Sequence, residues 1–99
     1  MRKIVLACAA GVSTNMLVKS MRKAASETGY VADIEAFPVG ELKRIVGDAD
    51  IVLLGPQIRF MADKVREMVD CPICVVDMAA YGMMDGAKAL AQAREVLGD

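Results

Sequence analysis

The chain has 99 residues, of which 56% are hydrophobic and 25% charged, and its formal net charge is −1. This length supports one hydrophobic core, so we expect a single globular domain over residues 1–99. The small net charge and the lack of a run of Lys and Arg argue against binding to nucleic acid or to an anionic lipid surface. Histidine is absent, which excludes His-based catalysis, His metal ligands and phosphohistidine on this chain.

No apolar stretch approaches the ~20 residues that a membrane span needs. The apolar run at residues 4–7 is also shorter than the ~7–15 residues of a signal-peptide core. We therefore expect a cytoplasmic chain with no direct membrane insertion. In that reducing compartment, three cysteines, an odd count, are expected to remain thiols.

Short apolar segments alternate with longer segments of helical spacing. The apolar segments predict strands at residues 4–7, 31–37, 51–54 and 73–76. Helices are predicted at residues 13–28, in a short segment after Pro38 that Gly47 closes, at 57–69 and at 86–97. This β-α alternation predicts an α/β domain of three layers, a four-stranded parallel sheet in the order 2-1-3-4 with helices on both faces.

Each predicted helix has a stripe of apolar residues that should face the sheet. The inward residues, helix by helix, are Leu17, Met21, Ala24 and Ala25; Leu42, Ile45 and Val46; Ile58, Met61, Val65 and Met68; and Leu90, Ala93 and Leu97.

The segment between the first strand and the first helix is the main candidate site. Its residues are Cys8, Ala9, Ala10, Gly11, Val12, Ser13, Thr14 and Asn15. Ligands of open α/β sheets bind beyond the carboxyl ends of the strands, and the start of a helix attracts anions. The same field lowers a cysteine pKa, so one loop can produce a thiolate nucleophile and hold a phosphoryl group. The alternative is a buried cysteine that ends a strand, followed by a Ser-Thr helix cap.

The position six residues after Cys8 separates two chemistries. Cysteine-dependent phosphatases have an Arg there that clamps the phosphate, whereas this chain has Thr14. A loop without that Arg is suited to hold a phosphocysteine rather than to hydrolyse it. A low-molecular-weight phosphatase or arsenate-reductase-like enzyme remains the second interpretation, and a non-catalytic binding module of flavodoxin-like fold the third.

The sequence resembles the enzyme IIB subunits of the lactose/cellobiose class, which includes the β-glucoside and diacetylchitobiose systems, of the bacterial phosphotransferase system. The resemblance covers nearly the whole chain and rests on the Cys-x-x-Gly-x-Ser-Thr loop combined with a Leu-Leu-Gly-Pro-Gln-Ile run. The matching segments are residues 8–14, 34–36, 52–58 and 77–86.

This resemblance implies a flavodoxin-like fold and a role as phosphoryl carrier in sugar uptake, without a cofactor or a metal. Cys8 would be the catalytic nucleophile, and residues 9–15 would bind the phosphoryl group. The donor would be a phosphohistidine of enzyme IIA, and the acceptor a sugar bound by the membrane subunit, enzyme IIC. The chain would thus associate peripherally with a membrane permease.

Other residues allow both a structural and a functional interpretation. Gly55, Pro56 and Gln57 end the third strand and form either a plain strand-to-helix turn or a second wall of the site. Arg59 is either a solvated helix-start residue or a contact for phosphate or a partner, and Asp77 and Tyr81 are expected to be structural.

The pair Cys71 and Cys74 precedes a strand rather than a helix, so we expect one cysteine in a turn and one in the sheet, not a redox pair or a zinc site. The methionines Met78, Met83 and Met84 are predicted to lie in a loop that faces the site, where flexible thioethers suit two successive partners.

Overall fold

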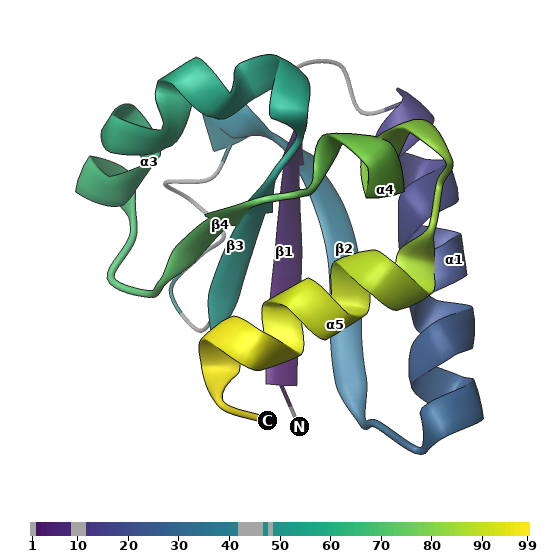
Figure 1. Ribbon diagram of the computed structural model, residues 1–99. Helices are drawn as coiled ribbons and strands as arrows, with labels where there is room; N and C mark the ends of the chain where they lie inside the picture. The colour runs from purple at the N-terminus through teal and green to yellow at the C-terminus, as the bar shows by residue number, and fades with distance from the viewer. Residues whose placement is uncertain (1, 9–11, 42–46, 48) are drawn as a thin grey trace.

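The computed structural model describes residues 2–8, 12–41, 47 and 49–99, without the side chains of residues 8 and 12–14. The chain forms a parallel four-stranded sheet in the order β2-β1-β3-β4, which confirms the predicted order (Figure 1). The strands are β1 (Arg2–Cys8), β2 (Ala32–Pro38), β3 (Ile51–Leu54) and β4 (Ile73–Val75).

Helices cover both faces of the sheet and mostly follow the predicted segments. They are α1 (Val12–Thr28), α3 (Ala62–Met68), α4 (Met78–Gly82) and α5 (Gly86–Leu97), with 3₁₀ turns η1 (Val39–Glu41) and η2 (Pro56–Met61). The predicted helices at 13–28 and 86–97 are confirmed as α1 and α5. Leu42, Ile45 and Val46 of the predicted second helix lie outside the described residues, and Gly47 lies in a turn.

The predicted continuous helix at 57–69 is wrong in its first part. Residues from Pro56 to Met61 form a 3₁₀ turn, and the backbone of Ile58 leaves the helical region, at φ −116° and ψ 21°. The predicted apolar stripe still holds, because Ile58 and Val65 are buried and Met61 and Met68 pack against the same cluster. A spacing of three residues fits one turn of 3₁₀ helix as well as an α-helix, so the stripe does not distinguish the two.

The prediction of a loop that includes Met78 is wrong for residues 78–82. They form the short helix α4, which begins with a cap from Asp77: its Oδ2 accepts a hydrogen bond of 3.1 Å from the backbone N–H of Ala80. The helix ends with a hydrogen bond from the N–H of Asp85 to the carbonyl of Ala80 at 2.8 Å, with Met84 in the left-handed region at φ 53°. This C-terminal turn is of the Schellman type, which glycine usually closes.

One core lies between the sheet and the pair α1 and α5. Alternate residues of the central strands point to this side, including Ile4, Leu6, Ile51 and Leu53. From the helices, the predicted inward residues Leu17, Met21, Ala25, Leu90 and Ala93 are buried, and Ala24 and Leu97 are partly buried against them.

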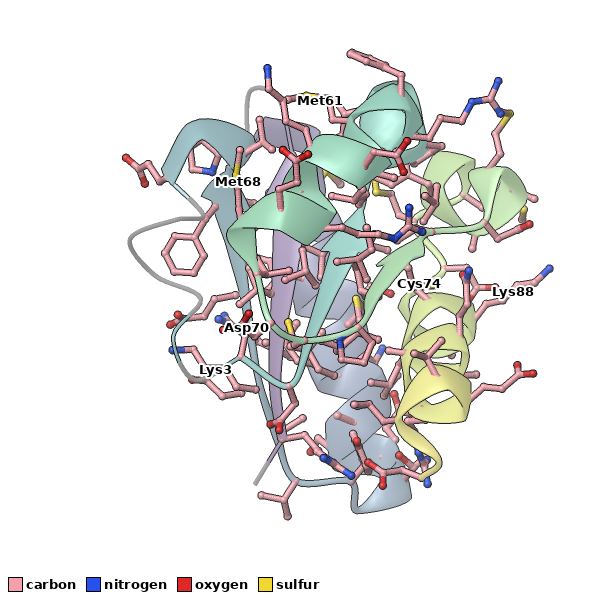
Figure 2. The ribbon with its side chains drawn as sticks, turned by 90° about the vertical axis from the view of Figure 1, so that its left-hand side faces the viewer. Lys3, Met61, Met68, Asp70, Cys74 and Lys88 are labelled. Atoms are coloured by element: carbon pink, nitrogen blue, oxygen red, sulfur yellow. The ribbon has the colours of Figure 1, made fainter. Side chains whose placement is uncertain are left out.

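The other core lies between the sheet and the segment η2–α3. The remaining residues of the same strands, Val5, Ala7, Val52 and Leu54, point to this side. In Figure 2 Met61 and Met68 lie on the α3 side of the sheet, and Cys74 lies toward α5. The result is the three-layer arrangement that the continuous apolar strands predicted.

Helices α1 and α5 come into close contact at Gly86. The N–H of Gly86 donates a hydrogen bond of 2.9 Å to Ser20 Oγ. A Cβ atom at this position would lie 2.2 Å from the carbonyl carbon of Ser20 and 2.3 Å from the nitrogen of Met21. The crossing of the two helices therefore depends on the missing side chain of Gly86.

The two ends of the chain lie near each other at the amino edge of the sheet (Figure 1), and a cluster of polar side chains joins them there. The Asp99 carboxylate accepts hydrogen bonds from Arg2 Nε at 2.9 Å and from the Tyr30 hydroxyl at 2.6 Å. The guanidinium of Arg94 stacks on the Tyr30 ring, 4.4 Å from its centroid. This cluster fixes the end of α5 against the start of β1, at the edge opposite to the candidate site.

Candidate functional site

The candidate site lies where the strands end and α1 begins. Strand β1 ends at Cys8, opposite Pro38 of β2, and the 17-residue helix α1 starts at Val12. Both the end of β1 and the start of α1 lie toward the carboxyl edge of the sheet, the upper edge in Figure 1. The main chain therefore ends β1 at Cys8, four residues before the first residue of this long helix.

Not every predicted site residue is described. Asn15 is exposed in the first turn of α1. Ala9, Ala10 and Gly11 lie outside the described residues, and so do the side chains of Cys8, Val12, Ser13 and Thr14. Their role in binding a phosphoryl group remains a prediction.

Gly55, at the end of β3, lies beside the end of β1. Its N–H donates to the carbonyl of Ala7 at 3.3 Å, and its own carbonyl accepts from the N–H of Ile58 at 3.0 Å. Gly55 is buried and starts the turn η2, with Pro56 as the first residue of that turn. The segment 55–57 is thus adjacent to the residue that precedes Cys8, where a second wall of the site was predicted.

Two side chains close around Gly55. A Cβ atom at Gly55 would lie 3.0 Å from Gln57 Oε1 and 3.5 Å from the ring of Tyr81. Glycine therefore lets the Gln57 amide fold back over the backbone, whereas the Tyr81 ring lies at an ordinary contact distance.

A mainly apolar hollow of about 260 Å³ lies next to this turn. It is lined by Pro56, Gln57, Met78, Tyr81 and Gly82, so it joins the end of β3 to helix α4. Tyr81 is 7% exposed and belongs to the core, which confirms the structural interpretation of this residue. Asp77 caps α4, which confirms its structural role as well.

Several exposed apolar side chains lie on elements of this edge, whereas two others, Val31 and Val96, lie elsewhere. Met16 on α1, Phe60 on η2, Met78 on α4 and Met83 after α4 are each more than 60% exposed. Met84 differs from the prediction, because it packs against the core between the sheet and α1 and α5 rather than facing the site. Arg59 is an exposed residue of η2.

Cys71 and Cys74 do not form a functional pair. Cys74 lies in β4 and packs against the core under α5, whereas Cys71 lies in the preceding bend and packs against the core under α3. The two side chains therefore occupy opposite faces of the sheet, and both are free thiols. Burial raises the pKa of each thiol, which disfavours the reactive thiolate.

Two further properties bear on the kind of site. Within the described ranges, no three side chains of the His, Cys, Asp or Glu types lie close enough together to hold a metal ion. None of the helices in this part of the chain is long and apolar enough to cross a membrane.

Known proteins resemble this chain over most of its length. The family described as the lactose/cellobiose-specific IIB subunit of the phosphotransferase system matches residues 3–92. The oligo-β-mannoside-specific EIIB component of Bacillus subtilis (strain 168) is 40% identical over 98% of this chain and 97% of its own length. The galactose-specific EIIB component of Lactococcus lactis subsp. cremoris (strain MG1363) is 40% identical over 95% and 94%.

Solved structures give the same result for the fold. The cellobiose-specific IIB component of Borrelia burgdorferi is 36% identical and superimposes with a TM-score of 0.80, over 98% of this chain and 92% of that one. The lactose-specific IIB domain of Streptococcus pneumoniae is 21% identical and shares the fold, with a TM-score of 0.83 over 96% of both chains.

Together the sheet order and these matches define a class of protein: a component of a phosphotransferase system for sugar uptake, which works with the other components of that system. Within this class, the chain belongs to the family of lactose/cellobiose-specific IIB subunits. The resemblance inferred from the cysteine loop and the Leu-Leu-Gly-Pro-Gln-Ile run is thereby confirmed.

Proposed function

We propose that Cys8 carries a phosphoryl group from a phosphohistidine of enzyme IIA to a sugar bound by membrane enzyme IIC. The observation that carries this proposal is the position of Cys8 at the end of β1, four residues before the 17-residue helix α1. Family membership supports it further. The chain would then act in the cytoplasm, beside the membrane that holds enzyme IIC.

The proposed chemistry has two displacements at phosphorus. In the first, the Cys8 thiolate attacks the phosphorus of the donor, the P–N bond breaks, and the histidine nitrogen leaves with the electron pair. In the second, a sugar hydroxyl oxygen attacks, the S–P bond breaks, the thiolate leaves, and the hydroxyl proton passes to a base or to water. Neither step needs a redox partner, and catalysis consists mainly of positioning and of stabilising charge.

The start of α1 would supply that stabilisation. The first turn of a helix has unpaired N–H groups and about half a positive charge, which favours both a thiolate and a phosphoryl group. Residues 9–15 would form the cradle, and Gly55, Pro56 and Gln57 would close it from the β3 side. Thr14, in the place of the phosphatase Arg, favours a carrier over a hydrolase.

Two different partners must reach the same cysteine in turn. The exposed side chains of Met16, Phe60, Met78 and Met83 come from the elements around the site and would provide an apolar contact surface. Unbranched thioether side chains adapt their shape at low cost, which suits a surface that accepts partners of different shape.

The proposal is tested by intact mass measurements. The protein is incubated with phosphoenolpyruvate, the general phosphotransferase proteins and a lactose/cellobiose-class enzyme IIA. We expect one added phosphoryl group that persists without sugar and enzyme IIC, and none in Cys8→Ser. The matched controls Cys71→Ser and Cys74→Ser should be phosphorylated like the wild type. Hydrolysis of an aryl phosphate without partners would instead indicate a phosphatase.

A further inference from the structure

Helix α5 contributes a polar contact to the edge of the sheet that the sequence did not reveal. The side-chain amide of Gln92, half-buried, makes three hydrogen bonds. Its Nε2 donates to the carbonyl of Val75 at 2.7 Å and to Cys74 Sγ at 3.2 Å, and its Oε1 accepts from the N–H of Asp77 at 3.0 Å. One side chain thus uses both its donors and its acceptor on a single segment.

The two main-chain groups that Gln92 binds, the carbonyl of Val75 and the N–H of Asp77, lie on the side of β4 that does not face β3. The N–H of Val52 donates to the carbonyl of Pro72 at 3.0 Å, and the N–H of Val76 donates to the carbonyl of Leu54 at 2.9 Å. Since main-chain groups alternate in direction along a strand, those of Val75 and Asp77 point away from β3. Gln92 therefore occupies the free edge of β4 in the place of a neighbouring strand.

The same contact fixes the start of α4. The N–H of Asp77 donates to Gln92, and the carboxylate of the same Asp77 caps this helix. A helix of only five residues is not stable by itself in water, so its position depends on the contacts at its ends. Gln92 anchors the first end, and the turn at Met84 anchors the second.

Helix α4 in turn borders the candidate site. Its residue Tyr81 packs beside Gly55, whose N–H is bonded to the carbonyl of Ala7. Contacts therefore connect Gln92 to the residue that precedes Cys8 through Asp77, α4 and the turn at Gly55.

We propose that Gln92 is a positioning residue for phosphoryl transfer: by holding the end of β4 and the start of α4, it keeps the wall formed by Tyr81 and Gly55 in place beside Cys8. This inference rests on the proposed function of Cys8. It assigns no contact between Gln92 and the phosphoryl group, so the residue should affect the rate of transfer and not the binding of the donor.

The test compares Gln92→Met with Gln92→Glu. Methionine has a similar length and no hydrogen-bonding amide, whereas glutamate keeps an acceptor for the N–H of Asp77. Lys88→Met is the matched control, because Lys88 is one turn away on α5 and its Nζ lies 3.9 Å from Asp77 Oδ2. Two quantities are measured in each variant: the hydrogen-exchange rate of the Asp77 amide by NMR, and the kcat and KM for transfer from a phosphorylated lactose/cellobiose-class enzyme IIA.

In Gln92→Met we expect Asp77 exchange to accelerate at least about fivefold, the factor that corresponds to one net hydrogen bond. We expect kcat to fall about tenfold with KM unchanged, as a displaced wall of the site would cause. Gln92→Glu should retain protection of Asp77 and more of kcat than Gln92→Met, and Lys88→Met should match the wild type in both.

Three outcomes would overturn the inference. Unchanged Asp77 exchange in Gln92→Met would show that Gln92 does not anchor α4. Faster exchange with unchanged kcat, or a loss of kcat equal in Lys88→Met, would show that the contact only stabilises the fold. A wild-type protein that accepts no phosphoryl group would instead refute the proposed function, and this inference with it.

Discussion

Replacing Gly86 with alanine places a methyl group inside the crossing of α1 and α5. The new carbon would lie 2.2 Å from the Ser20 carbonyl carbon and 2.5 Å from Ser20 Oγ, far closer than atoms in van der Waals contact. Helix α5 must therefore move away from α1, which breaks the 2.9 Å hydrogen bond from Gly86 to Ser20 and loosens the packing of Met21 and Leu90.

The size of the effect follows from three contributions. Overpacking costs about 1–3 kcal/mol, and the lost hydrogen bond about 1 kcal/mol. The better helix propensity of alanine offsets about 0.5–1 kcal/mol. We therefore expect Gly86→Ala to lower the free energy of unfolding by about 1–3.5 kcal/mol, a drop in Tm of about 4–28 °C for a domain of this size.

The assay is urea unfolding followed by circular dichroism, with Gly82→Ala as the control. No atom lies within 4 Å of a Cβ at Gly82, so that variant should unfold within about 1 kcal/mol of the wild type. If Gly86→Ala unfolded at the same urea concentration as Gly82→Ala, the close helix crossing would be wrong.

Further predictions concern the ionisable groups. Burial and the hydrogen bond to Asp99 raise the pKa of Tyr30 to about 12, so the folded protein favours the neutral phenol. The stability that the neutral Tyr30 phenol contributes is therefore complete below about pH 10 and is lost as the pH rises toward 12. Absorbance titration at 295 nm measures this ionisation, and the difference between the wild type and Tyr30→Phe isolates the signal of Tyr30. We expect Tyr30 to ionise late in the wild type and earlier in Asp99→Asn. Ionisation of Tyr30 near pH 10 in the wild type would contradict the hydrogen bond. Burial raises the pKa of Cys71 and Cys74, so iodoacetamide at pH 7 should modify Cys8 first. Peptide mass mapping identifies the modified cysteine. Modification of Cys71 or Cys74 before Cys8 would contradict a thiolate at Cys8.

Sequence patterns were sufficient for most of the fold because both cores are built from periodic apolar residues. Successive side chains along β1 and β3 point to opposite faces of the sheet, so that Ile4 and Leu6 enter one core and Val5 and Ala7 the other. The apolar residues of α1 and α5 have the spacing of one helical face. Gly29, directly after the last residue of α1, adopts the left-handed φ of 68° that suits glycine at the end of a helix.

Helix α4 could not be predicted because it has no periodic pattern. Its five residues are all apolar or small, and its start depends on the side chain of Gln92, 15 residues after Asp77. The sequence predicts an α-helix where η2 lies for a related reason, because the spacing of Ile58 and Met61 fits a 3₁₀ turn and an α-helix alike.

The candidate site was predictable in its position and not in its surroundings. A loop of small residues between a buried strand and a helix is sufficient to predict a binding site at the end of β1. The contact of Tyr81 with Gly55, and the fixing of α4 by Gln92, depend on residues far apart in the chain that only the folded structure brings together.

The most direct test of the account is to locate the phosphoryl group after transfer from enzyme IIA. Tandem mass spectrometry of the phosphorylated protein, combined with ³¹P NMR, distinguishes a phosphorus–sulfur bond from phosphate on oxygen. We predict a single phosphothiol on Cys8, with Cys71 and Cys74 unmodified. A phosphoryl group on any other residue, or no stable transfer to a protein that is folded and has Cys8 reduced, would contradict the role of Cys8 as carrier.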